Sequence, residues 1–184
     1  MRRSAVYVSK RTVIITVLSV LSAAAASAEV IDRVVAVVGG QIITQSDVDA
    51  AAAFGLGSNL QALIDRTLML SDVRRVAPPD PAPTAVEARL ARIRAIFAAP
   101  DGFARALEVS GLNEAAVRFY AAEDLRLSAF LDERFSSASQ PTEEEVRQAG
   151  EAARARLIAE RRQTLVDAWI AELRRHADIT VIGP

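Results

Sequence analysis

The chain of 184 residues lacks cysteine altogether and has a single histidine, His176. The absence of cysteine excludes a disulfide scaffold, a thiolate nucleophile and any zinc site with cysteine ligands. One histidine excludes a metal site built from several imidazoles and leaves little scope for acid–base catalysis. Aromatic residues make up only 5% of the chain, whereas 36 residues are alanine. This composition favours helices with few large core side chains.

The first 28 residues have the pattern of an export signal. Their start is basic, with Arg2, Arg3, Lys10 and Arg11. The run 12–28 carries no charge and ends in Ala26-Ser27-Ala28, the small-x-small pattern that a signal peptidase accepts. We expect cleavage after Ala28 and export to the periplasm. Retention of this segment as an inner-membrane anchor is the alternative.

Cleavage after Ala28 would leave residues 29–184 with 18 basic and 23 acidic residues, a net charge of −5. The cleaved chain would contain no lysine, because Lys10 is the only one in the sequence. Nothing concentrates positive charge on one face, so we exclude nucleic acid as a partner. No later segment approaches a membrane-spanning length, and we expect no stable membrane insertion after cleavage.

Two segments at opposite ends of residues 29–184 have the pattern of β-strands. The run 34–43 has two β-branched stretches around Gly39-Gly40, which can supply the positive φ angles of a hairpin turn. The other strand-like run is 179–182, Ile-Thr-Val-Ile. Because an isolated hairpin is only marginally stable, we expect this run to return and pair with it. The predicted fold is mainly α, a multi-helix core with a small N-terminal β-hairpin joined by a C-terminal strand.

The sequence between these ends has the pattern of successive helices. Ser46 is the expected N-cap of an alanine-rich helix that stops at Gly55 or Gly57. Residues 60–76 have apolar side chains on two opposite sides, which predicts a central, buried helix. Thr84 and Glu87 have the spacing of a capping box at the start of the next helix.

Three further helices are expected in the second half of the chain. A short helix covers 103–109, and Asn113 caps the long helix that follows. After a polar linker at 136–140, Thr142 and Glu145 have the spacing of a second capping box. The apolar stripe then changes face between Gln148 and Arg156, near Gly150. Either two helices meet there or one long helix changes partners.

Several segments, taken in order, resemble SurA-type periplasmic chaperones. The run 35–49 resembles the start of that family, in which a valine-rich strand, a turn, a second strand and a Ser-Asp-Val segment lead into a helical core. Further similar segments are Leu63-Ile64-Asp65-Arg66, Gly111-Leu112-Asn113, Pro141-Thr142-Glu143-Glu144-Glu145-Val146 and Ala168-Trp169-Ile170. The resemblance covers essentially all of residues 30–182 and depends on the ordered series rather than on one motif.

The chain departs from that family at one place. Its members normally insert one or two parvulin-type prolyl isomerase domains, each of about a hundred residues, before the final helix. Here about ten residues separate Val146 from Leu157. The resemblance therefore implies a chaperone core without its isomerase. Its N-terminal part would be 29–140, completed by the helix and strand of 141–184.

Sequence features that could suggest catalysis have simpler interpretations. His176 ends a basic helix terminus and Glu143-Glu144-Glu145 begins a helix, and each charge complements the helix dipole there. Gly55-x-Gly57 lacks the preceding strand and the following Gly-Lys-Ser/Thr of a phosphate loop. We expect no catalytic residue, no metal site and no cofactor.

Two residues of the last helix have expected roles in its packing. Trp169 is expected to be a core anchor between this helix and its neighbours. Arg162 falls within an apolar stripe, where we expect it to snorkel or to pair with an acidic residue.

Four phenylalanines are the candidate peptide-binding residues: Phe97, Phe103, Phe119 and Phe130. Phe119 and Phe130 share a flank of the long helix, about 100° from its main apolar stripe. Packing against another helix and an exposed wall for client peptides both remain open for this flank. Phe97 and Phe103 flank the break at Pro100.

The resemblance implies an ATP-independent periplasmic holdase that binds unfolded outer-membrane β-barrel precursors or other exported proteins. Such a protein covers apolar segments with broad, adaptable apolar surface and performs no catalysis. A residual or degenerate prolyl isomerase is one alternative, and an envelope-assembly protein with one dedicated partner is another. Client identity, oligomeric state and exchange of the terminal helix between two copies remain open.

Overall fold

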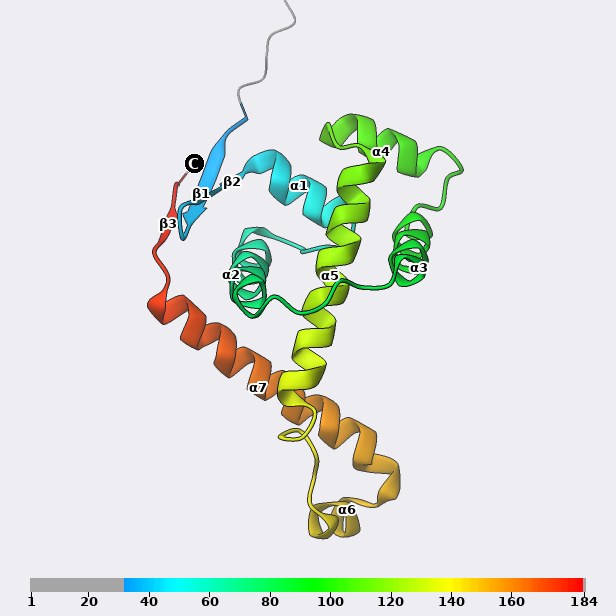
Figure 1. The fold of residues 1–184 in the computed structure, drawn as a ribbon, viewed down its shortest axis with the longest axis vertical. Helices are drawn as coiled ribbons and strands as arrows, with labels where there is room; N and C mark the ends of the chain where they lie inside the picture. The colour runs from blue at the N-terminus through cyan, green and yellow to red at the C-terminus, as the bar shows by residue number, and fades with distance from the viewer. Residues whose placement is uncertain (1–31, 184) are drawn as a thin grey trace, which may run out of the picture. The chain divides into compact units, whose positions relative to one another are not determined.

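The structure, a computed structural model, describes residues 32–183, so the predicted export signal at 1–28 lies outside the described residues. Figure 1 shows how the described elements are arranged. They are β1 (Val34–Val38), β2 (Gln41–Thr44), α1 (Gln45–Ala53), α2 (Leu60–Val76), α3 (Pro83–Arg94), α4 (Gly102–Ser110), α5 (Glu114–Phe135), α6 (Glu143–Ala149), α7 (Arg154–His176) and β3 (Ile179–Val181). Within this range no helix combines the length and the apolar character that crossing a membrane requires.

The three strands form one antiparallel sheet in the order β2-β1-β3. Gly39 and Gly40 turn the chain between β1 and β2 with φ angles of 54° and 81°, the left-handed region that favours glycine. On the other edge of β1, Ala36 lies opposite Val181. The blue and red strands of Figure 1 therefore lie side by side, although they come from opposite ends of the sequence. The predicted mainly α fold, with a hairpin joined by the C-terminal strand, is confirmed.

The first helix begins two residues earlier than predicted. Thr44, not Ser46, is the N-cap of α1, because Thr44 and Asp47 form a reciprocal capping box. The hydroxyl of Ser46 instead donates to the carboxylate of Asp32. Thr44 is also the last residue of β2, so the strand passes directly into the helix.

The predicted capping box of Thr84 and Glu87 is wrong. Pro83 begins α3, and the cap residue Ala82 makes no side-chain hydrogen bond. Proline is well suited to this position because the first helical N–H groups have no partner within the helix. Glu87 accepts a hydrogen bond from Arg118 of α5 instead. The predicted caps of α5 and α6 are confirmed.

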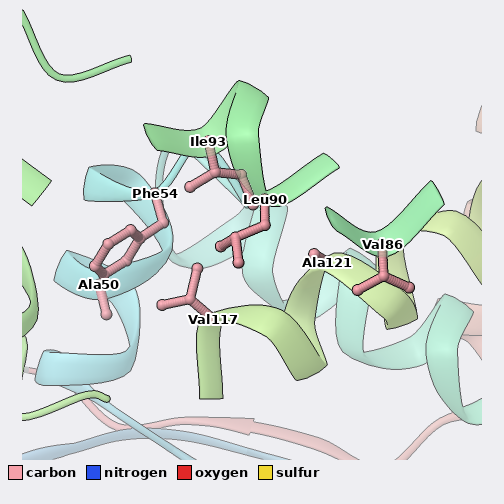
Figure 2. Packing of buried hydrophobic residues seen from close by; sticks show 7 residues of the cluster. All are labelled: Ala50, Phe54, Val86, Leu90, Ile93, Val117 and Ala121. Carbon is pink, nitrogen blue, oxygen red and sulfur yellow. The ribbon is translucent and has the colours of Figure 1, made fainter. Parts of the chain in front are cut away.

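The first apolar cluster joins α1, α3 and α5. Its buried members are Ala50, Phe54, Val86, Leu90, Ile93, Val117 and Ala121. In Figure 2, Phe54 at the end of α1 converges with Leu90 of α3 and Val117 of α5. The partly buried α4 side chains Phe103 and Leu107 pack against this cluster, so α4 covers one side of it.

Helix α2 has neighbours on both of its apolar sides. Ile64 and Leu68 pack against the inward side chains of β1 and β2, in a cluster with Val35, Ala36, Val38 and Ile43. Leu70 and Val73 pack against side chains of α5 and α7. The predicted central position of this helix is confirmed.

The change of apolar face near Gly150 marks the meeting of two helices. Gly150 ends α6 with a φ angle of 84°, and a short 3₁₀ turn, Glu151–Ala153, leads into α7. Val146 of α6 is buried, and Glu145 pairs with Arg161 of α7 at 2.6 Å. These contacts hold α6 against the first part of α7.

Trp169 is the core anchor of α7 that the sequence predicts. It is 7% exposed. Its ring centroid lies 5.5 Å from that of Phe130 and 6.0 Å from that of Phe135, both on α5. The guanidinium of Arg134 lies over the Trp169 ring at 5.3 Å from its centroid, a favourable cation–π distance. This cluster joins α7 to α5.

Replacing Trp169 with alanine should lower the free energy of unfolding by about 3–5 kcal/mol, because it removes a buried aromatic side chain and leaves a cavity. Urea unfolding followed by circular dichroism measures this loss, since the only tryptophan of the chain is removed and its fluorescence with it. Phe119→Ala is the control: Phe119 is 53% exposed on the same partner helix, and its loss should cost less than about 1 kcal/mol. Equal losses in the two variants would contradict this account of α7.

Candidate functional site

The four candidate phenylalanines lie in three different environments. Phe97 and Phe103 are partly buried, and each forms an edge-to-face pair with Phe54 at ring-centroid distances of 5.8 and 6.0 Å. Phe130 is 7% exposed and packs against Trp169. Phe119 is 53% exposed. Of the four, Phe119 alone is extensively exposed to solvent.

The alternative of an open wall lined by both Phe119 and Phe130 is therefore wrong. The two residues do share a flank of α5, but α7 crosses that helix near its end and covers Phe130. For Phe130 the packing alternative is correct. For Phe119 no described helix supplies such a cover.

Phe119 borders a shallow groove between α5 and the start of α3. The groove has a volume of about 640 Å³. Its apolar lining consists of Pro81, Ala82, Pro83, Val86, Ala115, Phe119 and Ala122. Three of these residues come from the segment in which proline prevents α2 from continuing and starts α3. The sequence thus places a rigid apolar loop beside an exposed aromatic ring.

The charged residues of this groove are paired with one another. The Nε atom of Arg118 donates to Glu87 at 2.7 Å, and this hydrogen bond lowers the pKa of Glu87 and raises that of Arg118. Arg126 pairs with Asp80, and this hydrogen bond raises the pKa of the guanidinium. Because each charge has a neighbour of opposite sign, the groove combines an apolar lining with no uncompensated charge.

A second recess lies on another side of α5. It is a pocket of about 230 Å³ between β2, α1, α2 and α5. Exposed Ile42 lies at the β2 wall, and buried Arg66, Thr67 and Leu70 form the α2 wall. Tyr120 lines this pocket, and partial burial of its hydroxyl raises the pKa of Tyr120. Since successive helix residues point about 100° apart, Phe119 and Tyr120 face different recesses.

Ion pairs fix the helices that form these recesses. Asp124 of α5 accepts from Arg66 of α2 at 2.8 Å and from Arg89 of α3 at 2.7 Å. Its neighbour Glu123, 4% exposed, pairs with Arg74 of α2 at 2.9 Å. An arginine forms directional, often bidentate, hydrogen bonds to carboxylates. The pairs therefore set the spacing of α2, α3 and α5 as well as neutralising charge.

The histidine and the glutamates that we interpreted as complementing helix dipoles lie away from both recesses. His176 is the last residue of α7, with its ring beside Glu172. Glu143, Glu144 and Glu145 form the first turn of α6. In the described range, 32–183, no three His, Asp or Glu side chains are grouped as metal ligands.

The prediction for Arg162 is confirmed. Arg162 pairs with an acidic residue, Asp132 of α5, at 2.6 Å. Gly55 and Gly57 lie in the turn after α1, which no strand of the described chain directly precedes.

Sequence reasoning missed the pocket of Ile42, Arg66 and Tyr120. One signal was available: Arg66 falls between the apolar positions Leu63, Ile64 and Leu68 of a helix predicted to be buried. A charged residue there must find an acidic partner or line a recess, and Arg66 does both. The partner, Asp124, lies 58 positions further along the chain, and no local pattern connects the two.

Comparison with known proteins adds no relative: no protein-family model matches the chain, and no curated protein matches it. The resemblance to SurA-type chaperones therefore stays a prediction from the sequence.

Glu145 should titrate near pH 2. The backbone N–H of Thr142, then Arg161 and the Thr142 hydroxyl, lower its pKa from 4.5 to about 2. A carboxylate with a lowered pKa stabilises the fold at pH values above its ordinary pKa, and this contribution is lost as the pH falls from about 4.5 to about 2. Glu145→Gln should remove this pH-dependent part and leave a smaller loss of stability across the same range.

Carboxyl chemical shifts followed by NMR as the pH falls from about 6 to about 1.5 measure the titration directly, because this range includes both the ordinary pKa of 4.5 and the lowered value of about 2. Arg161→Gln is the control variant: it removes the α7 partner but keeps the Thr142 hydrogen bonds, so the pKa of Glu145 should rise only part of the way. A midpoint near 4.5 in the unaltered protein would contradict the capping geometry.

Proposed function

We propose that the protein is an ATP-independent periplasmic holdase that binds unfolded outer-membrane or other exported polypeptides and performs no catalysis. The observation that carries this proposal is the exposed ring of Phe119 in an apolar groove whose charged residues are paired. The order of segments that resembles SurA-type chaperones supports the same function.

The chemistry of the groove fits unfolded barrel strands. Such strands alternate apolar and polar residues, so each presents a row of apolar side chains on one side. An apolar groove without an unpaired charge can accept these side chains with little dependence on their identity. Covering them for a time protects the client against aggregation without changing any bond.

The construction of the groove also fits a binding role. Exposing a large aromatic ring to water has a free-energy cost of about 25 cal/mol for each Å² of apolar surface. Phe130 on the same helix is buried, whereas the ring of Phe119 stays 53% exposed beside the apolar lining of the groove. The rigid prolines beside Phe119 lose little conformational freedom when a client binds.

The purified protein should suppress the light scattering of a urea-unfolded porin after dilution. Phe119→Ser should weaken this suppression severalfold, because the groove loses the large apolar group that contacts the client. Val109→Ser is the matched control: Val109 is 89% exposed but lies on α4, outside the lining of either recess. Its substitution should leave suppression unchanged.

Three results would count against the proposal. Unchanged porin aggregation at severalfold excess of the protein would contradict the proposed holdase function. Equal suppression of aggregation by the Phe119 and Val109 variants would show that chaperone activity does not depend on the groove. A photocrosslinker at position 119 that captures one dominant periplasmic protein would favour the dedicated envelope-assembly partner instead.

A further inference from the structure

The outer edge of β3 is a surface that the proposed function does not involve. The carbonyl of Asp178 accepts from the N–H of Gly39 at 2.8 Å, and the N–H of Ile182 donates to the carbonyl of Val35 at 2.9 Å. In an antiparallel ladder the residues alternate between facing the partner strand and facing away from it. The backbone groups of Ile179 and Val181 therefore point away from β1, at the edge of the sheet.

No element within residues 32–183 pairs with this edge, because the strand order is β2-β1-β3. Its side chains are accessible: Val181 is 51% exposed and Ile182 is 44% exposed. Natural sheets commonly protect an open edge with a charge, a proline or a bulge, or keep the edge strand short, as β3 is. The strand Ile179–Val181 has no charged residue and no proline, and the irregularity in pairing lies between β1 and β2.

The opposite edge of the sheet is protected. The register places the backbone of Ile42 on the outer side of β2, and Thr44 is the next residue that faces outward. The N–H of Thr44 is already bonded to the carboxylate of Asp47. The start of α1 thus closes that edge after one residue, whereas β3 offers two residues whose outward donors and acceptors are not paired with any strand of residues 32–183.

We propose that the β3 edge binds one extended segment of an unfolded polypeptide as a fourth strand. This inference rests on the proposed function and gives it a second contact. Backbone N–H and C=O groups at strand spacing select an extended chain whatever its side chains are. The absence of charge on β3 makes the selection independent of client charge. A stable dimer buries about 1,200 Å² or more, which so short a strand cannot supply, so the edge fits a single extended segment better than a second copy.

Val181→Pro tests the proposal. The N–H of Val181 faces away from β1, and proline is tolerated at such an edge position because the existing ladder is kept. The substitution removes one outward donor and places a ring against the incoming strand. Val181→Thr is the matched control, since it keeps the N–H and a similar side-chain volume. Thermal unfolding should show that both variants are folded.

The probe is a fluorescein-labelled peptide of alternating valine and threonine with a lysine at each end, about ten residues long, the length of one barrel strand. Fluorescence anisotropy should give a Kd at least about fivefold higher for Val181→Pro than for the unaltered protein. For Val181→Thr, Kd should stay within about twofold. Hydrogen exchange followed by NMR should show that the peptide protects the amides of Ile179 and Val181. Those of Thr180 and Ile182 are already bonded and should change little.

The outcomes separate this inference from the proposed function. If the protein suppresses porin aggregation but Val181→Pro binds the peptide as tightly as Val181→Thr does, the edge is not a client site and this inference alone fails. If the protein neither binds the peptide nor suppresses aggregation, both fail. Protection of the Ile179 and Val181 amides that grows with protein concentration in the absence of peptide would assign the edge to a second copy and overturn the proposal.

Discussion

The two-sided apolar character of α2 is the constraint on which the rest of the fold depends. A helix with one apolar side can lie on the surface, but α2 must be covered on two sides. One cover is the sheet, which contacts Ile64 and Leu68. The other is formed by α5 and α7, which contact Leu70 and Val73. Since β3 and α7 are adjacent in sequence, the same C-terminal segment contributes to both covers, and α2 links the two ends of the described chain.

Arginine–carboxylate ion pairs provide polar contacts that hold the same helices together. The chain from residue 11 onward has no lysine, and arginine–carboxylate pairs connect α2, α3 and α5 through Glu123 and Asp124. A guanidinium combines charge with several directional donors, so it fixes helices relative to one another better than an ammonium group does. The pairing has a consequence for the surface: the Phe119 groove presents no uncompensated charge.

Local patterns predicted most of the fold and little of the site. Gly39-Gly40, the bounds of α2 and the return of β3 follow from periodicity and from the need of a hairpin for a third strand. The start of α3 was not predicted. Pro83 takes the first position of the helix, and Glu87 pairs with the distant Arg118 rather than with Thr84. The prediction of an open wall at Phe119 and Phe130 was wrong for a different reason. A helical wheel gives the direction of Phe119 and Phe130 but not the path of α7, which covers only Phe130.

The two surfaces proposed to contact a client would recognise different parts of it. The Phe119 groove offers apolar contact, which depends on side chains, whereas the β3 edge offers hydrogen bonds, which depend on an extended backbone. Each contact alone would be weak, because the groove is shallow and the edge presents only two residues. An unfolded chain that engages both gains from the high effective concentration of the second contact. A folded client has buried most of its apolar side chains and paired most of its strands, so it would engage both surfaces less well. Under the proposed function, this difference would release a client once it folds, without ATP.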